Sequence, residues 1–320
     1  MKFLQHHSIA KFEGPKSRSH EKVPLWKLWL QAKKQRILRP RDRPDSFVQF
    51  IGFPRSGHSL VGAILNARER VCLSHELDAM GLLLRGFSPS DIFSLIRWHE
   101  DLFERNGRYW NNFQYNLEFH EPKKSGGPVI LGDKKGDWTA RHLADSEHSV
   151  DSLSVRLGVP IRWILVLRNP FDNISTLSLR LGREYDRIRI ETKNEIEFKS
   201  RIAEVDDRIV PKTIRDEMIE DYFGLCDSIN RVKIEVDPNF WFELDYEQFK
   251  MDTALVTEAL CGWLSLPCSE DYKHAVRKIV RRGGNPSRYD IAWSKNQKAL
   301  VSDRMKQYTF LSRFSDDFDS

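Results

Sequence analysis

The sequence lacks most features of membrane-spanning, disulfide-stabilised or secreted proteins. No apolar run in its 320 residues approaches the roughly 20 that cross a bilayer. Residues 1–11 contain no apolar block of signal-peptide length. The four cysteines, none of them in a Cys-x-x-Cys pair, do not suggest a disulfide framework. These absences predict reduced thiols, a cytoplasmic location and no transmembrane segment.

The sequence also lacks the residue patterns of a metal site and of a kinase-type phosphate loop. No constellation of His, Cys and carboxylate residues has the spacing of a metal site, so we expect no metal ion. The kinase loop Gly-x-x-x-x-Gly-Lys-Ser/Thr, whose hydroxyl holds Mg²⁺, does not occur either. An ordinary nucleoside-triphosphate enzyme is therefore disfavoured.

Positive charge is concentrated at the start of the chain. The net charge is +5, but residues 1–45 contain 12 Lys and Arg against four acidic residues, which leaves −3 for the remainder. A nucleic-acid-binding domain would need a basic surface, so we expect no nucleic-acid partner.

We predict a basic N-terminal arm and helix over residues 1–45, and one main domain over 46–320. Residues 1–23 are polar and predict a loose arm. Residues 25–38 have apolar side chains at helical spacing with basic ones between them, typical of an amphipathic helix. This helix either docks on the main domain through Trp26 and Trp29 or contacts a membrane surface.

From residue 46 onward, short apolar runs are separated by helical stretches. The runs are near-continuous rather than alternating, which is typical of strands buried on both faces. They predict an α/β fold of three layers, with a central parallel sheet of about five strands and helices on both faces. The highly charged stretch 183–231 predicts a helical cap over the sheet edge or a solvated helical insertion. The expected strands are 46–53, 70–73, 128–132, 161–167 and 239–244.

The first expected strand runs into the segment PRSGHS (54–59) and then a helix. In such a P-loop-like turn, N–H groups without helical partners point outward at the positive end of the helix dipole. Gly57 can take backbone angles denied to other residues, and Arg55 has a planar charged fork suited to phosphate. His58 and Ser59 offer side-chain donors. The segment predicts a phosphate site.

Two segments together resemble the donor-binding motifs of sulfotransferases that use 3′-phosphoadenosine 5′-phosphosulfate (PAPS). FIGFPRSGHSLVGAIL (50–65) resembles the 5′-phosphosulfate loop, which reads Pro-Arg/Lys-Ser-Gly-Thr-Thr in many members. WILVLRNPFDNISTLSLR (163–180) resembles the 3′-phosphate motif, a strand ending in Arg, then Asn-Pro, and a hydroxyl residue eight positions after the Arg. The two motifs in this order are more specific than either alone.

Three further segments extend the resemblance over most of residues 46–312. LGDK (131–134) is similar to a strand-end segment of Golgi tyrosylprotein-type and bacterial members. DYE (245–247) resembles the Tyr-Glu-Asp-Leu segment of the family, although Tyr246 and Glu247 also fit a purely structural role. RRGGNPSRYDIAW (281–293) resembles the basic loop that closes over the nucleotide.

The resemblance implies PAPS as co-substrate, no metal, and a set of site residues. The 5′-phosphosulfate would be held by Arg55, Ser56, Gly57, His58 and Ser59, and the 3′-phosphate by Arg168, Thr176 and Arg180, with Arg288 in the closing loop. Glu76 takes the position of the catalytic base, and Lys134 that of a transition-state lysine, with Arg55 as the third catalytic group.

Several positions depart from the family pattern and leave alternatives open. His58 replaces the usual Thr. Either Ser175 or Thr176 could be the hydroxyl ligand. Lys134-Lys135-Gly136 stands where Lys-Thr-Pro or Lys-Asp-Pro is usual, which makes Lys135 a competing candidate.

Two assignments also have a plain structural reading. Arg168 could simply pair with Asp172. Ser74 could cap a helix from residue 75, where an acidic residue in the first turn stabilises the dipole by about 0.3–1 kcal/mol. His75 is the nearest rival to Glu76 as the base, and Asp78 a weaker one.

We therefore expect a sulfotransferase that moves a sulfuryl group from PAPS to an acceptor hydroxyl. The family's habits slightly favour a glycan as the acceptor. The alternatives are an inactive homologue that binds a nucleotide or glycan, and an atypical P-loop kinase.

Overall fold

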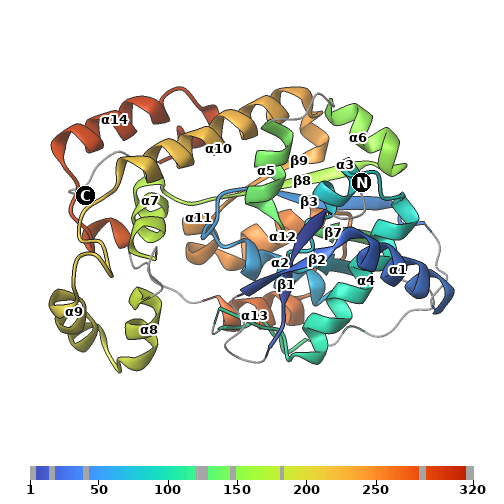
Figure 1. Ribbon diagram of the computed structural model, residues 1–320, viewed down its shortest axis with the longest axis horizontal. Helices are drawn as coiled ribbons and strands as arrows, with labels where there is room; N and C mark the ends of the chain where they lie inside the picture. Colours follow the sequence, from blue (N-terminus) through green and yellow to red (C-terminus); the bar gives the residue numbers. More distant parts are fainter. Residues whose placement is uncertain are drawn as a thin grey trace.

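A five-stranded parallel sheet forms the centre of the computed structural model, with helices on both faces (Figure 1). The strand order is β4–β7–β3–β8–β9. The predicted fold class is confirmed. The strands are β3 (Ser46–Gly52), β4 (Val71–Ser74), β7 (Ile130–Asp133), β8 (Ile161–Leu167) and β9 (Trp241–Asp245). The structure describes residues 5–13, 19–38, 43–111, 113–119, 121, 129–144, 149–180, 184–280 and 286–314.

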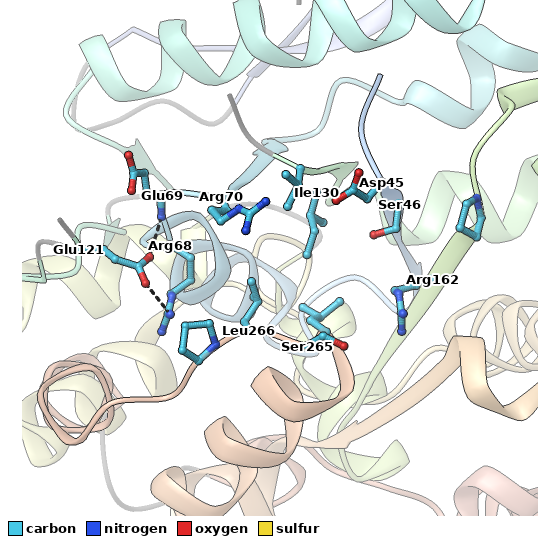
Figure 2. A pocket seen from close by; sticks show the side chains of 14 residues that line it. Asp45, Ser46, Arg68, Glu69, Arg70, Glu121, Ile130, Arg162, Ser265 and Leu266 are labelled. Carbon is cyan, nitrogen blue, oxygen red and sulfur yellow. Dashed lines mark hydrogen bonds and ion pairs between the residues drawn. The ribbon is translucent and has the colours of Figure 1, made fainter. Parts of the chain in front are cut away.

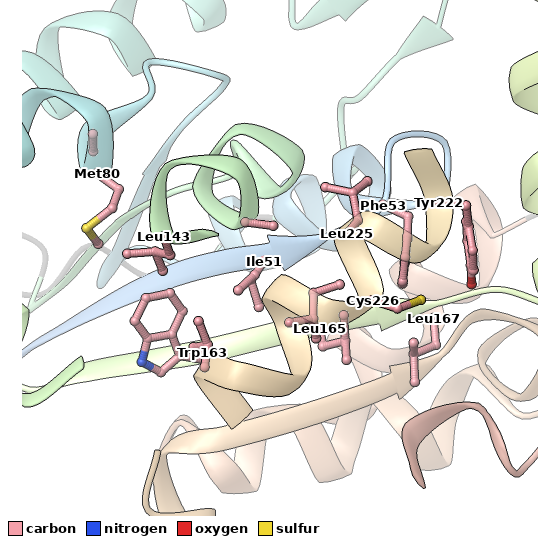
Figure 3. Packing of buried hydrophobic residues seen from close by; sticks show 14 of the residues in the cluster. Ile51, Phe53, Met80, Leu143, Trp163, Leu165, Leu167, Tyr222, Leu225 and Cys226 are labelled. Atoms are coloured by element: carbon pink, nitrogen blue, oxygen red, sulfur yellow. The ribbon is translucent and has the colours of Figure 1, made fainter. Parts of the chain in front are cut away.

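The strands are apolar without alternation because both faces of the sheet are covered. In β3, Phe47 and Ile51 pack into the larger hydrophobic cluster, whereas Val48 and Phe50 pack into the smaller one on the other face. Figure 3 shows the larger cluster, where Trp163 and Leu165 of β8 lie with Ile51 beneath two helices. All the expected strands form, each within two residues of its predicted limits.

The helices divide between the two clusters. The larger cluster receives α3 (Ala79–Leu84), α4 (Pro89–Arg105), α5 (Gly136–Ala144), α6 (Val150–Leu157), α7 (Pro170–Leu179), α10 (Asp216–Glu235) and α14 (Lys295–Met305). The smaller one receives α2 (His58–Asn66), α11 (Tyr246–Met251), α12 (Thr253–Trp263) and α13 (Glu270–Ile279). A short hairpin, β5 (Tyr109–Trp110) with β6 (Phe113–Gln114), and three 3₁₀ turns at 238–240, 287–289 and 309–311 complete the described elements.

The start of the chain is a docked hairpin where a loose arm was predicted. β1 (His6–Lys11) pairs antiparallel with β2 (Ser19–Pro24). Ile9 is buried in the main core, and the imidazole of buried His7 shares a hydrogen bond of 2.9 Å with the Leu77 carbonyl. The prediction is wrong for these strands because a polar sequence can be buried through hydrogen bonds to a distant turn.

The predicted helix after this hairpin is confirmed as α1 (Leu25–Leu38), but it docks through other residues than expected. Leu25, Leu28 and Ala32 are buried in the main core, and α1 packs against α4. Trp26 and Trp29 remain 41% and 40% exposed, so docking through these two rings is wrong. None of the described helices is long and apolar enough to span a bilayer.

The charged stretch 183–231 contains three helices: two pack against each other, and the third packs on the sheet. α8 (Glu184–Glu191) and α9 (Glu195–Glu204) pack against each other and are drawn below α7 in Figure 1. α10 instead packs against β3 and α5, and its Tyr222 and Cys226 are wholly buried. α10 therefore belongs to the helices that cover the sheet, with a charged outer face over an apolar inner one.

Candidate active site

Most of the predicted site residues follow the ends of four of the five parallel strands. The 54–59 loop follows β3, Glu76 follows β4, Lys134 follows β7, and Arg168 follows β8. Parallel strands place their carboxyl ends at one edge of the sheet, where α/β proteins bind ligands. β3 is central, so its loop lies between the residues that follow β7 and β8.

The 54–59 loop is a tight turn whose backbone is held from inside. Arg55 and Gly57 have positive φ angles of 67° and 108°. The Ser56 hydroxyl donates to the Phe53 carbonyl at 2.9 Å and is fully buried. A Cβ at Gly57 would lie 2.6 Å from the ring of Tyr246, so this position requires glycine. The loop presents the N-terminus of α2 to the sheet edge.

His58 turns its ring into the protein. The side chain is buried, and a Cβ added to Gly136 would lie 2.5 Å from its Cε1 atom. Burial lowers the pKa of His58 to about 3, so the imidazole is neutral. The ring therefore fills the space that Gly136 leaves, and what His58 offers to an anion at the sheet edge is its backbone N–H.

Glu76 is the centre of a cluster of charged side chains. Lys134 Nζ donates to Glu76 Oε1 at 2.6 Å, and Lys135 Nζ donates to Oε2 at 3.0 Å. Lys134 also donates to Ser59 Oγ at 2.9 Å, which connects the cluster to the phosphate loop. The structure thus brings both candidate lysines to Glu76, and Lys134 contacts the loop as well.

The charge state of the Glu76 carboxylate follows from these contacts. Burial raises its pKa, but the ammonium groups of Lys134 and Lys135 and a hydrogen bond from His20 outweigh this effect. The pKa of Glu76 is consequently held well below 4.5, and the side chain is ionised at neutral pH.

The turn that carries Glu76 is strained and firmly held. Glu76 has a φ of 65°, in the left-handed region that L-residues seldom occupy. Buried Asp133, at the end of β7, accepts from the Ser74 hydroxyl at 2.7 Å and from the N–H groups of Leu77 and Ala79 at 3.0 Å each. Strain of this kind often marks functional sites.

The same contacts correct the structural reading of Glu76. The helix begins at Ala79 rather than residue 75, and Asp78 is its N-cap. The hydroxyl of Ser74 is engaged with Asp133 instead. Glu76 therefore lies in a turn and does not stabilise a first helical turn.

The two rival bases are less well placed than Glu76. His75 is buried with its ring stacked on Phe103 at 4.2 Å between centroids. Burial, followed by the charge of Lys134, holds the pKa of His75 well below 6.5. Asp78 is buried beside His142, 3.0 Å from its Nε2.

A second group of donors lies at the end of β8. Arg168 donates through Nη1 to Thr176 Oγ1 at 2.9 Å and through Nη2 to Ser287 Oγ at 3.3 Å. Thr176 in turn donates to Ser287 at 2.9 Å. Ser175 instead accepts from Trp293 Nε1 at 3.0 Å, so Thr176 is the hydroxyl that faces Arg168. One guanidinium and two hydroxyls converge here, a donor set that suits a phosphate.

The remaining predicted donor residues lie around this group. Arg288 forms a bidentate pair with Asp172, at 3.1 and 2.9 Å. Arg180 follows the last residue of α7. Residues 281–285 of the predicted closing loop lie outside the described residues. Asn173 of α7 donates to the Pro54 carbonyl at 3.2 Å, which connects the 54–59 loop to the helix that follows Arg168.

A pocket at the opposite edge of the sheet is a poor candidate for the site (Figure 2). It is lined by Ser46 and Ile130, the first residues of β3 and β7. Its three arginines are matched by three acidic side chains, and Arg68 pairs with Glu121 at 2.8 Å. The pocket therefore has no excess of positive charge to attract an anionic ligand. Among the described residues, no group of three or more His, Cys, Asp or Glu could hold a metal ion.

Sequence reasoning missed two residues of this edge. Ser287 lies in the segment quoted for its resemblance, yet nothing singled out its hydroxyl, which reaches Arg168 across the fold. His20 comes from the hairpin taken for a loose arm, and its Nε2 lies 2.7 Å from Glu76 Oε2. A lone histidine in a polar stretch has no pattern that would have identified it.

No protein family and no curated protein matches this sequence. Several solved structures with a similar chain trace are sulfotransferases. Sulfotransferase STF9 from Mycobacterium avium is 11% identical, over 88% of this chain and 81% of its own, with a TM-score of 0.46. Mouse sulfotransferase SULT7A1, complexed with PAP, is 11% identical over 90% and 92%, with a TM-score of 0.41. The sulfotransferase from Alicyclobacillus acidocaldarius is 14% identical over 83% and 94%, with a TM-score of 0.37.

Proposed function

We propose that this protein transfers a sulfuryl group from PAPS to an acceptor hydroxyl. The observation that carries the proposal is the pair of anion sites at one sheet edge, joined by the hydrogen bond from Asn173 to Pro54. PAPS carries two separate phosphate groups, at its 3′ and 5′ positions. AMP and ATP lack the 3′-phosphate and would leave the group around Arg168 without a ligand.

The donor's two ends match the two sites in chemical type. The turn with Arg55 and Gly57 offers N–H groups and one guanidinium to the 5′-phosphosulfate. The group of Arg168, Thr176 and Ser287 offers one cation and two hydroxyls to the 3′-phosphate. The chain has no loop that would hold a triphosphate with Mg²⁺, which supports PAPS over ATP.

In the proposed step, the acceptor oxygen forms a bond to sulfur while the bond between sulfur and the phosphate oxygen of PAPS breaks. The acceptor's proton passes to the Glu76 carboxylate and then to solvent. The leaving phosphate keeps the electron pair of the broken bond. Adenosine 3′,5′-bisphosphate (PAP) and the sulfated acceptor are the products. As in phosphoryl transfer, the protein's part is positioning and charge stabilisation.

Lys134 is proposed to connect the base to the reacting group. Its ammonium contacts both Glu76 and Ser59, so it lies between the carboxylate and the phosphate loop. A cation at this place can stabilise negative charge that develops on the sulfonate and leaving oxygens. When Lys134 turns toward that charge, Glu76 loses one of its ammonium partners and becomes more basic.

The deciding experiment offers sulfur-labelled PAPS and a panel of glycans, tyrosyl peptides, lipids and small alcohols. We favour a carbohydrate hydroxyl as acceptor. Labelled product that depends on Lys134 supports the proposal, with Lys134→Met as the control. Phosphorylated product from ATP and Mg²⁺ would instead show a kinase. Tight PAP binding without turnover on any acceptor would show an inactive homologue.

A further inference from the structure

We infer that the N-terminal hairpin completes the active site, with His20 as a positioning residue for Glu76. This inference rests on the proposed function, because it assigns a role in the same reaction. The sequence places His20 in a polar stretch 56 residues before Glu76. The fold nevertheless brings the two side chains into contact, at 2.7 Å between His20 Nε2 and Glu76 Oε2.

Hydrogen bonds connect the hairpin to the turn that contains Glu76. The N–H of Ala10 in β1 donates to the Glu76 carbonyl at 3.1 Å. His7, three positions earlier in β1, contacts the carbonyl of Leu77 through its imidazole at 2.9 Å. His99 of α4 contacts the Ala10 carbonyl at 3.2 Å, which also connects β1 to α4. Glu76 is thus held in its strained conformation partly by β1.

β2 adds the side-chain contact. His20 lies 29% exposed, with its ring edge-on to Trp110 at 5.5 Å between centroids. Because Glu76 is ionised and accepts only, the nitrogen that faces it must carry the proton. Lys135 Nζ lies 3.3 Å from the same nitrogen and 3.0 Å from Glu76 Oε2. His20 and Lys135 therefore fix one carboxylate oxygen, while the other faces Lys134 and the phosphate loop.

The two carboxylate oxygens of Glu76 therefore have different partners and different roles. Oε1 is next to Lys134, which also contacts Ser59, so it lies on the side of the donor loop. Oε2 is held by the hairpin and by Lys135. His20 thus aims the base and helps to keep it ionised, without itself meeting the substrate.

The test compares His20→Ala and His20→Gln with His6→Ala, an exposed histidine of β1 in the same hairpin. His20→Ala should lower kcat by about 10²-fold, the effect of misplacing a reacting group, with PAP affinity unchanged. His20→Gln keeps an N–H donor and should recover part of the rate. His6→Ala should match the wild type.

The pH profile separates positioning from general damage. Glu76 must be ionised to act, and His20 is one of the groups that lower its pKa. Removing His20 raises that pKa, so the acid-side fall of kcat/KM should begin at a higher pH in His20→Ala than in the wild type. A His20→Ala enzyme within threefold of the wild-type rate, with an unmoved acid limb, would overturn the inference. A wild-type protein that binds no PAP would instead overturn the proposed function.

We also propose that the outer face of α1 contacts an anionic membrane surface. Trp26, Leu30 and Ile37 lie on one side of this helix at helical spacing and are 41%, 51% and 80% exposed. Lys27 and Lys34 flank this line and are exposed as well. Aromatic and aliphatic side chains bordered by lysines are typical of helices that lie in the lipid interface.

The inner face of α1 fixes the helix in this orientation. Leu25, Leu28 and Ala32 are buried in the core, so the helix cannot turn its apolar outer line inward. Lys33 also donates to Asp91 of α4 at 3.0 Å. The outward charge of Lys27 and Lys34 complements anionic headgroups, which attract basic segments close to the surface.

Flotation with lipid vesicles tests this surface. The protein should bind vesicles of phosphatidylcholine mixed with phosphatidylserine, bind phosphatidylcholine alone weakly, and dissociate at high salt. Leu30→Glu with Ile37→Glu should abolish binding, whereas Ile196→Glu, at an exposed position of α9, should not. Equal flotation of these variants would overturn the proposal. A dimer in light scattering that Leu30→Glu with Ile37→Glu dissociates would show that a second copy covers the face instead.

Discussion

At the scale of single residues, Glu76 is the side chain on which the proposed reaction depends. Glu76→Gln keeps the shape but removes the charge and the basicity, so turnover should fall by about 10²–10⁴-fold, the usual contribution of a general base. The measurement is single-turnover transfer from labelled PAPS.

The same substitution should also lower stability. Lys134 and Lys135 lose the carboxylate that both contact, and the loss of one partner from a buried ion pair is costly. The assay must therefore run well below the melting temperature of the variant. Turnover within threefold of the wild-type rate would transfer the role of base to another group.

A second prediction at this scale concerns His58 and Gly136, two departures from the family pattern that the structure relates to each other. A Cβ on Gly136 would lie 2.5 Å from the buried ring of His58, which has no room to move. Gly136→Ala should therefore destabilise the protein by about 1–3 kcal/mol, as overpacking does. His58→Thr should remove most of that cost in the double variant.

Denaturant unfolding of the two single variants and the double variant measures the coupling. Independent effects of the two substitutions would show that the ring and the glycine are not matched.

At the scale of elements, the hairpin β1–β2 should contribute to the stability of the fold and to activity. Deleting residues 1–24 removes Ile9 from the core and the contacts of β1 with the Glu76 turn. We expect the melting temperature to fall by several degrees, since about 1 kcal/mol corresponds to 2–4 °C in larger domains. Transfer from PAPS should fall as well.

This outcome is the reverse of what the sequence predicts for a loose arm. Calorimetry of the truncated and full-length proteins decides between them. An unchanged melting temperature, with full activity, would contradict the docked hairpin.

Some elements of the fold could be predicted from the sequence, and others could not. The strands were predictable because a strand buried on both faces is a continuous apolar run, as in 161–167. α10 was not separated from the cap because its acidic outer face hides the inner positions of Ile219, Tyr222 and Phe223. The hairpin β1–β2 was not predicted because its burial depends on hydrogen bonds to a turn far away in the sequence.

The site was predictable to the extent that it consists of strand ends. Once the strands are parallel, Glu76, Lys134 and Arg168 come to one edge without further information. Contacts with residues that do not follow a strand end cannot be predicted in this way. Thr176 meets Ser287, which is 111 residues away, and His20 meets Glu76 only through the docking of the hairpin.

At the scale of the whole molecule, the fold gathers the proposed base, two lysines and two proposed anion sites at the carboxyl edge of one sheet. The loop after β3 lies centrally, and Asn173 fixes its distance from the group around Arg168. Two rigidly spaced anion sites favour a ligand with two phosphates at a matching distance. Recognition of such a nucleotide is therefore the central claim.

Calorimetry with PAP and AMP tests that claim most directly. PAP should bind the wild-type protein far more tightly than AMP, because only PAP has a 3′-phosphate for Arg168, Thr176 and Ser287. Arg168→Ala should lose most of this preference, about 1.5–3 kcal/mol for a charged hydrogen bond. Equal affinity of the wild-type protein for PAP and AMP would contradict the assignment of the second anion site, and with it the proposed sulfuryl transfer.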